Sequence, residues 1–405
     1  MARAGNRVTI LEARERCGGR IWSLPAAEFG YKAEGGPEFV HGASPVTRAV
    51  MREAGLSLQP RGGSRWSTRG GALAPDDSPL PHADRFYQTL REVTVDLPIA
   101  DFLEQHFGAP KYERLRRSIT RTVEGYDAAD PSRASTLALR EEWLARDDGQ
   151  HGRIAEGYGA LIDHLANECR RHGAAFSFAA VVTALEETGG GVAAHCRDGV
   201  TVEADAAILT VPVPLLAEIA LPPAARERAA AAADIGYGNV VKLLLRFRTA
   251  WWGELGDGDL ADLSFLLSDA PVPTWWTQHP DPYPVLTGWF AGPKADRAAA
   301  LSEADFVEMG LRSLTEIFAL PPDRLRPHLA AARAINWGND PFARGAYSYA
   351  TPQTRAAQAM LNQPSGSIFF AGEALYAGPD MGTVEAALAN GLDTAKRILS
   401  GNGRQ

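Results

Sequence analysis

The sequence predicts an α/β fold, α+β over the whole chain, in which strands and helices at the two ends of the chain form one ligand-binding unit. Two observations carry this prediction for the 405 residues. Residues 369–373, FFAGE, are typical of a buried strand and a loop, and residues 382–387, GTVEAA, begin a helical pattern. Residues 8–12, VTILE, are typical of an apolar strand that ends in an acidic residue.

The N-terminal pattern indicates a nucleotide site of the Rossmann type. The second strand of a dinucleotide-binding βαβ unit ends in a carboxylate, because that group accepts hydrogen bonds from ribose hydroxyls. Glu12 is the candidate. Gly18 and Gly19 would let the backbone pass close to a bulky ligand, and Arg20 could donate charge-assisted hydrogen bonds to a pyrophosphate.

The C-terminal pattern places a helix N-terminus after the loop. Such an end presents unpaired N–H groups and a partial positive charge, so it suits a phosphate or another electron-rich group such as the carbonyl edge of a flavin. The segment 382–387 is therefore a second candidate contact to the same ligand.

These two ends, with GYG at 157–159 and Lys242 between them, resemble the flavin-dependent amine oxidase family of monoamine oxidases, polyamine oxidases and related flavoproteins. The resemblance implies FAD as cofactor. Some monoamine oxidases have a flavin-bonding cysteine at the position of Ala346, so the flavin is expected to be noncovalent. The family pattern implies a discontinuous Rossmann-like FAD-binding domain (residues 1–57, 151–234 and 346–405) and a substrate-binding domain of mixed sheet plus helices (residues 58–150 and 235–345).

One expected motif does not occur. The glycine fingerprint Gly-x-Gly-x-x-Gly would lie roughly 20 residues before Glu12, which falls upstream of Met1. Residues 1–6 are instead interpreted as a helix end that Gly5 closes in the left-handed conformation. The chain is therefore expected to lack the first βα unit, which would weaken cofactor retention.

Composition limits the classes of function. A content of 45% hydrophobic and 22% charged residues is that of an ordinary globular protein. A net charge of −8 argues against nucleic acid as a partner and mildly favours the approach of cationic amines. The longest apolar stretch, 204–221, contains charged residues and prolines, so no membrane span is predicted. Three cysteines without Cys-x-x-Cys spacing favour a reducing compartment, and a cytoplasmic location is expected.

Elements between the two ends follow from local patterns. Residues 97–107 and 112–125 predict helices, and residues 240–247 predict a strand. Residues 192–196 and 201–211 predict a hairpin arm that leads into an apolar strand, ended by Pro212.

Lys242 is the first candidate catalytic residue. It interrupts the apolar run 240–247, and a lysine there must either reach solvent or find a buried polar partner, because an unpaired buried ammonium is unfavourable. In the family the lysine at this position holds a water against flavin N5 and aids the reaction with oxygen, a role that the resemblance implies for Lys242. The alternative is an exposed strand lysine.

Tyr347 is the second candidate catalytic residue. The resemblance places it as one aromatic wall of a cage that guides an uncharged amine. Thr383 takes the opposite position, where monoamine oxidases have tyrosine, so a typical monoamine pocket is not expected. Trp337 and His41 are further candidates for the substrate pocket, and the alternative for His41 is a purely structural histidine.

The family pattern implies a set of cofactor contacts and no metal. The residues expected to hold the cofactor are Glu12, Arg14, Gly19, Arg20, Val182, Gly372, Glu373, Thr383 and Val384. No cluster of His, Asp or Glu has metal-ligand spacing.

The leading hypothesis is an FAD-dependent oxidoreductase that oxidises an amine to an imine by hydride transfer to flavin N5, with oxygen as acceptor and hydrogen peroxide as product. The alternatives are a flavin-dependent desaturase or porphyrinogen-type oxidase on the same fold, and an inactive flavoprotein remnant. The missing fingerprint motivates the remnant. The sequence predicts neither the identity of the amine nor the oligomeric state.

Overall fold

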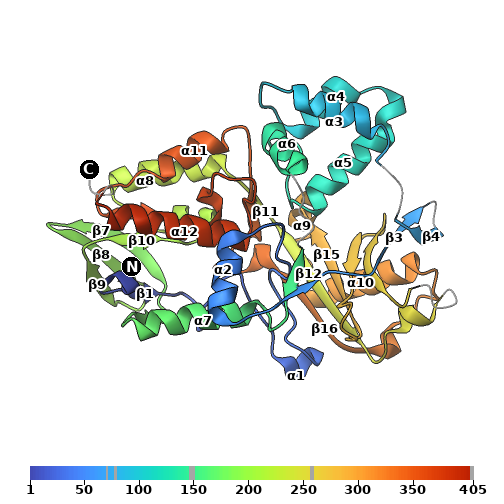
Figure 1. Ribbon diagram of the computed structural model, residues 1–405, viewed down its shortest axis with the longest axis horizontal. Helices are drawn as coiled ribbons and strands as arrows, with labels where there is room; N and C mark the ends of the chain where they lie inside the picture. Colours follow the sequence, from blue (N-terminus) through green and yellow to red (C-terminus); the bar gives the residue numbers. More distant parts are fainter. Residues whose placement is uncertain (70–71, 77–79, 146–150, 256–259, 402–405) are drawn as a thin grey trace.

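The computed structural model describes residues 1–69, 72–76, 80–145, 151–255 and 260–401, and shows an α/β fold, as predicted. The parallel strands lie on one side of the molecule with α7 (Tyr158–Arg171), α8 (Pro223–Ala230), α11 (Thr354–Leu361) and α12 (Val384–Leu399). A large mixed sheet lies on the other side, and a group of helices lies above that sheet (Figure 1). Residues 70–71, 77–79, 146–150, 256–259 and 402–405, which the predicted domains include, lie outside the described part of the chain. The division into domains stays a prediction.

Two parallel strand pairs bring the chain ends together. β1 (Thr9–Leu11) pairs with β6 (Ala175–Ser177), and β10 (Ala207–Leu209) pairs with β18 (Ile368–Phe370). Helices α7 (Tyr158–Arg171) and α12 (Val384–Leu399) belong to the same part of the molecule. The residues that follow β1, β10 and β18 all line one cavity, as expected where the carboxyl ends of parallel strands meet.

A seven-stranded sheet has the strand order β16-β12-β15-β14-β13-β3-β4. Its strand β12 (Val240–Phe247) pairs antiparallel with β15 (Val285–Ala291) and β16 (Leu329–Asn336). Because side chains alternate along a strand, Leu243 and Leu245 pack toward the core shared with α10 (Glu303–Ile317), and Lys242 lies on the opposite face with Leu244. The remaining strands are β13 (Leu263–Leu267), β14 (Thr274–Trp276), β3 (Ser64–Arg69) and β4 (Ala72–Pro75).

The helices above the sheet have a core of their own. Helices α3 (Ala83–Glu92), α4 (Ile99–Phe107), α5 (Glu113–Gly125) and α6 (Thr136–Leu144) bury Phe86, Phe102, Phe107 and Leu115 among one another. The segment that follows α5 carries Tyr126 and Asp127 into the cavity lining. This helical group therefore forms one wall of the cavity.

The remaining elements are short or peripheral. They comprise α1 (Ala26–Phe29), α2 (Pro45–Ala54), β2 (Leu58–Pro60), β5 (Gly152–Ile154), β7 (Val182–Thr188), β8 (Gly191–Cys196), β9 (Thr201–Ala204), α8 (Pro223–Ala230), β11 (Gly236–Gly238), α9 (Pro293–Arg297), β17 (Tyr347–Tyr349) and α11 (Thr354–Leu361), with short 3₁₀ turns between them.

The predicted elements agree with the structure within one to three residues. α4 and α5 correspond to the predicted helices 97–107 and 112–125, β12 matches 240–247, and β7, β8 and β9 form the hairpin arm. Gly5 ends a short 3₁₀ turn, Ala2–Ala4, with φ of 84°, which confirms its left-handed conformation. None of the described helices is long and apolar enough to cross a bilayer.

Candidate active site

One cavity of about 1430 Å³ connects the chain ends with the mixed sheet and the helical group. Its lining includes Glu12 and Val182 near the parallel strands, Glu373 beside α12, and Lys242 and Tyr347 next to the mixed sheet. All the predicted site residues line it: Glu12, Arg14, Gly19, Arg20, His41, Val182, Lys242, Trp337, Tyr347, Gly372, Glu373, Thr383 and Val384. The structure thus brings together residues that the sequence spreads over more than 370 positions.

The loop after β1 lies at one end of the cavity. The Oε1 atom of Glu12 accepts a hydrogen bond from the backbone N–H of Arg14 at 2.8 Å, which fixes the carboxylate directly beyond the strand. The Arg14 guanidinium does not lie free, because it forms a two-pronged ion pair with Asp340 at 2.9 and 2.6 Å. Gly19 has φ of 57°, and a Cβ atom at this position would meet no other atom within 4 Å, so space is open there.

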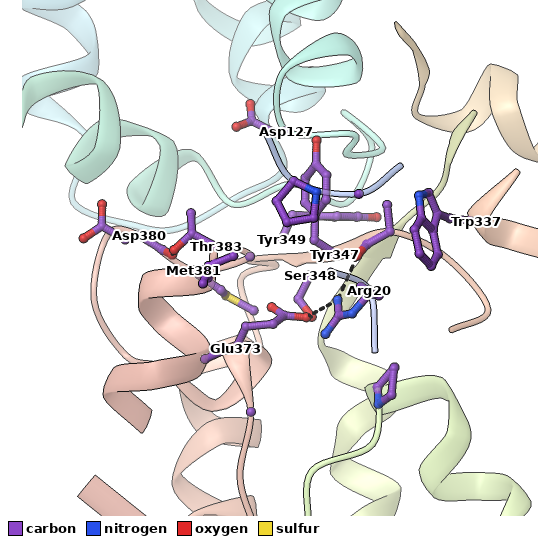
Figure 2. A pocket seen from close by; sticks show the side chains of 18 of the residues that line it. Arg20, Asp127, Trp337, Tyr347, Ser348, Tyr349, Glu373, Asp380, Met381 and Thr383 are labelled. Carbon is purple, nitrogen blue, oxygen red and sulfur yellow. Dashed lines mark hydrogen bonds and ion pairs between the residues drawn. The ribbon is translucent and has the colours of Figure 1, made fainter. Parts of the chain in front are cut away.

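Arg20 and Glu373 meet in the middle of the cavity. Arg20 Nη1 donates to Glu373 Oε1 and to the backbone carbonyl of Ala346, both at 2.8 Å, and Ser348 Oγ donates to the same Glu373 oxygen at 3.1 Å (Figure 2). The second oxygen, Oε2, is buried and has no hydrogen-bond partner among the described residues. A buried carboxylate oxygen without a donor is unfavourable, which points to a donor group on a bound ligand.

The start of α12 forms the adjoining wall. Thr383 is the N-cap, and its Oγ1 accepts from the Ala386 N–H at 3.1 Å and donates to the Asp380 carbonyl at 2.6 Å. Val384 begins the helix. Gly372 adopts φ of 144° and donates its N–H to Asn390 Oδ1 at 2.9 Å, and its Cα side is open. At Gly372 the backbone therefore faces the cavity with no side chain between them.

Lys242 is buried, with 1% of its surface exposed, so the alternative of an exposed strand lysine is wrong. Its Nζ donates to Glu38 Oε2 at 2.9 Å and to the Gly36 carbonyl at 3.0 Å. The Trp276 ring lies with its centroid 5.5 Å from Nζ. The lysine has therefore found the buried polar partner that its apolar strand requires.

Tyr347 belongs to an aromatic wall that the sequence did not predict as a unit. Its ring stacks on Trp289 with 6.5 Å between centroids, and Trp289 in turn contacts Trp276 at 5.7 Å. The Tyr347 hydroxyl donates to the Tyr126 carbonyl at 2.7 Å, which fixes the ring. Aromatic bulk therefore continues from Tyr347 along β15 and β14 rather than across to Thr383.

The two remaining pocket candidates differ in their surroundings. Trp337 is buried and donates its Nε1 hydrogen to the Gly35 carbonyl at 3.1 Å, so it supports the loop that precedes Glu38. His41 contacts the rings of Tyr126 and His151, with centroids 5.9 and 5.5 Å away. Both line the cavity, Trp337 at the loop before Glu38 and His41 among aromatic rings.

Three carboxyl groups line the cavity: Asp127, Glu142 and Asp380. Asp127 lies near Tyr347, and Asp380 lies beside Thr383 (Figure 2). Burial and the charge of Asp380 raise the pKa of Glu142 to about 7. Burial, and secondarily Glu142, raises the pKa of Asp127, whose Oδ2 has no hydrogen-bond partner among the described residues. A cationic ligand would relieve this mutual repulsion.

Several residues of the site were not predicted from the sequence. Glu38, Arg153, Trp276, Trp289 and Asp127 all lie at the cavity or against it, yet they fall on segments far apart in the sequence. The one signal that could have found them was Lys242, whose apolar strand requires a partner. Among the described residues, no group of three or more His, Cys, Asp or Glu side chains could hold a metal ion.

The fold and the cavity define an α/β protein with one large cavity that parallel strands and a mixed sheet both line. Residues 1–399 match the model of the family described as flavin containing amine oxidoreductase, and the chain belongs to this family. The predicted resemblance is thereby confirmed, and so is a flavin as the class of cofactor.

Two curated relatives show which proteins the chain is similar to. The chain is 25% identical to polyamine oxidase 4 of Oryza sativa subsp. japonica, an alignment that spans 100% of this chain and 86% of the relative. It is 23% identical to lysine-specific histone demethylase 2 of Homo sapiens over 98% of this chain. The chain spans 51% of that relative's length.

Solved structures share the fold. Wild-type putrescine oxidase bound to putrescine superposes with a TM-score of 0.81 at 20% identity, over 98% of this chain and 94% of that one. Cyclohexylamine oxidase from Brevibacterium oxydans gives a TM-score of 0.76 at 22% identity, with 97% and 93% covered. At these identities the superpositions establish the fold alone.

Proposed function

We propose that the protein is a noncovalent FAD-dependent oxidase of amines. The observation that carries the proposal is the single cavity that runs from Glu12, past Arg20 and Glu373, to Lys242 and Tyr347. Its volume of about 1430 Å³ exceeds the roughly 300–1,000 Å³ typical of a small-molecule site, which suits a dinucleotide and a substrate together.

The cavity lining fits FAD at three points. Glu12 would accept from ribose hydroxyls, the unpartnered Glu373 Oε2 would accept from a hydroxyl of the cofactor, and the N-terminus of α12 would face an electron-rich group. In this proposal, the part of the molecule that carries β1, β6, β10 and β18 is the Rossmann-like part that binds FAD. Ala346 offers no sulfur for a covalent link.

When bound, FAD would take a hydride equivalent from the carbon next to the amine nitrogen, and oxygen would take the two electrons to give hydrogen peroxide. The residues of the chain would bind the cofactor and the amine and orient them toward each other. Tyr347 and Trp289 present apolar faces to a neutral amine, and Lys242 offers an ammonium hydrogen at the same end of the cavity. The imine then hydrolyses in water.

The favoured substrate in this proposal is an aliphatic amine with a second cationic group. Asp127, Glu142 and Asp380 would attract that group while the reacting amine lies at Tyr347. The relatives named polyamine oxidase and the structure of putrescine oxidase bound to putrescine agree with this class. A cytoplasmic location belongs to the same proposal.

The test is an assay of peroxide release by FAD-loaded protein with matched pairs of monoamines and diamines of equal carbon number. Peroxide with at least one amine, and a higher kcat/KM for diamines, is the expected result. A protein that holds FAD and releases no peroxide with any amine contradicts the proposed oxidase. Equal kcat/KM within each pair contradicts only the proposed substrate class.

A further inference from the structure

The carboxylate of Glu38 is the centre of a buried network at the Lys242 end of the cavity. Its Oε2 accepts from Lys242 Nζ at 2.9 Å and from Trp276 Nε1 at 3.0 Å, and its Oε1 accepts from Arg153 Nε at 2.9 Å and from Gln278 Nε2 at 3.0 Å. The two charged side chains at this carboxylate come from β12 and β5, and Glu38 is 7% exposed. Every lone-pair direction of the carboxylate is thus used.

The loop that carries Glu38 is also held through its backbone carbonyl groups. Trp337 Nε1 donates to the Gly35 carbonyl, and the Gly36 carbonyl accepts from Lys242. A side chain at Gly36 would lie 2.0 Å from the Arg20 carbonyl, so only glycine permits this close approach. The loop therefore connects the Arg20 region of the cavity to Lys242.

The charges within the network do not cancel. Lys242 and Arg153 supply two positive charges against the one negative charge of Glu38. Burial opposes the charge of Glu38, but Lys242 and Arg153 outweigh it and lower the pKa of Glu38 to about 2. The other titratable groups that face the network are Glu34 and Tyr31, and burial raises the pKa of each.

An ammonium has three hydrogens, and within the described residues Lys242 donates two of them, to Glu38 and to Gly36. Because Lys242 lines the cavity, the third hydrogen is available to a molecule there. Without the carboxylate, a lysine buried beside Arg153 would favour its neutral form, which offers fewer hydrogens and no charge.

We propose that Glu38 is a positioning residue that keeps Lys242 protonated and directs one of its hydrogens into the cavity. The use of that hydrogen during amine oxidation rests on the proposed function. The protonation state itself does not, so it can be tested on protein that contains neither FAD nor an amine.

The experiment measures the extent of Lys242 acetylation by acetic anhydride against pH, with peptide mass spectrometry as readout and the exposed Lys111 and Lys396 as internal references. In Glu38→Gln the pH of half-labelling is expected to fall by about 2 units or more relative to the wild type, since a buried lysine without a counter-charge readily loses its proton. An unchanged half-labelling pH overturns the proposal.

Glu34→Gln is the matched control. It removes another buried carboxyl from the same loop region, one that hydrogen-bonds to Ser23 and the Tyr158 N–H and acts on Lys242 through its charge alone. The half-labelling pH of Lys242 is therefore expected to fall by less than half as much as in Glu38→Gln. A fall as large as that of Glu38→Gln would mean that general burial of charge, and not Glu38, controls the lysine.

A comparison of the stability of two variants tests the same role where Glu38→Gln does not fold. The double variant Glu38→Gln/Lys242→Met removes both partners, so it is expected to fold and to be more stable than Glu38→Gln alone. If the double variant is as unstable as the single one, the contacts of Glu38 that matter are those with Arg153 and Trp276. This result overturns the proposed role of Glu38 toward Lys242. In FAD-loaded protein, the pH profile of reoxidation should shift in Glu38→Gln in the same direction as the labelling.

Discussion

Glu142 shows how one residue can set the pH dependence of substrate preference. Its pKa is raised to about 7 by burial and by Asp380, so the carboxyl is mostly neutral at pH 6 and mostly charged at pH 8. A charged carboxylate attracts a second ammonium group, and a neutral one does not.

Between pH 6 and pH 8 the KM for a diamine should therefore fall by more than the KM for the matched monoamine. The ratio of the diamine KM to the monoamine KM should decrease by a factor of roughly 3 to 10. Steady-state kinetics at both pH values measures this, and the monoamine corrects for the protonation of the reacting amine itself. In Glu142→Gln the ratio of the two KM values should lose this pH dependence, and a ratio that still changes would exclude Glu142 as the cause.

Glu373 supports a second prediction at the residue scale. It pairs with Arg20 through Oε1 and leaves Oε2 for a ligand, so Glu373→Gln replaces one of two acceptors and removes the charge opposite Arg20. Charge-assisted hydrogen bonds contribute about 1.5–3 kcal/mol, so the Kd for FAD should rise by about tenfold or more. Flavin fluorescence titration measures the change. Glu28→Gln, which breaks the Glu28–Arg333 pair away from the cavity, should leave the Kd unchanged.

Local patterns of strand, loop and helix start predicted that Glu12, Arg20 and the start of α12 lie at one site, and the family resemblance added Val182 and Glu373. Neither predicted Asp340 as the partner of Arg14 or Ser348 as a partner of Glu373.

The sequence predicted that Lys242 needs solvent or a partner, but not which partner. Glu38 lies 204 positions from Lys242, and Arg153 comes from a third segment. Such a network depends on how the mixed sheet packs on the N-terminal loop, which no local pattern encodes.

At the scale of elements, α12 depends on its N-cap. Thr383 accepts from the Ala386 N–H, and loss of such a cap typically reduces stability by about 1 kcal/mol. Thr383→Ala should reduce the free energy of unfolding by that amount and loosen the helix end that faces the cavity. Denaturant unfolding measures it. Thr89→Ala, in the interior of α3, is the control, and equal losses in both variants would argue against a capping effect.

Glu34 couples the loop after α1 to the start of α7. Its Oε1 accepts from the Tyr158 N–H and from Ser23 Oγ, both at 2.8 Å, while Oε2 is buried with no hydrogen-bond partner among the described residues. Burial is the main cause that raises its pKa to about 7. A carboxyl whose pKa is raised on folding stabilises the fold below its unfolded pKa, and this contribution is lost as the pH rises toward the folded value.

The wild-type free energy of unfolding should therefore decline between about pH 4.5 and pH 7 by an amount on the order of 3 kcal/mol from this group alone. Glu34→Gln cannot ionise, so its stability should be flatter over the same range and higher than that of the wild type at pH 8. Urea unfolding at several pH values is the measurement. Parallel pH curves for the two proteins would show that Glu34 is not responsible.

At the scale of the whole molecule, the cavity separates the parallel strands from the mixed sheet. The β1–β6 and β10–β18 pairs form separate two-stranded sheets in the described part of the chain. A ligand that spans the cavity would therefore add to the links that the chain already makes there, such as the Arg14–Asp340 ion pair. The α/β class and several elements, among them β12, α4 and α5, follow from the sequence. The order of the seven-stranded sheet does not, because β3 and β13 pair across about 200 positions.

FAD should accordingly stabilise the protein as a whole. At a free concentration of 100 times Kd, binding to the folded state alone adds about 2.7 kcal/mol to the free energy of unfolding. Thermal unfolding with FAD should thus occur at a higher Tm. FMN, which lacks the adenosine half that Glu12 and Val182 would hold, should raise Tm less. Equal shifts for both ligands would contradict the proposed position of the nucleotide.

The cavity is proposed to hold FAD where an amine can reduce it. The decisive measurement is the visible absorption spectrum of FAD-loaded protein, recorded under anaerobic conditions while monoamines and diamines are added in turn. We expect flavin bands that bleach with at least one diamine and return when oxygen is admitted. Protein that stays colourless with excess FAD, or bound flavin that no amine bleaches, would contradict the proposed function.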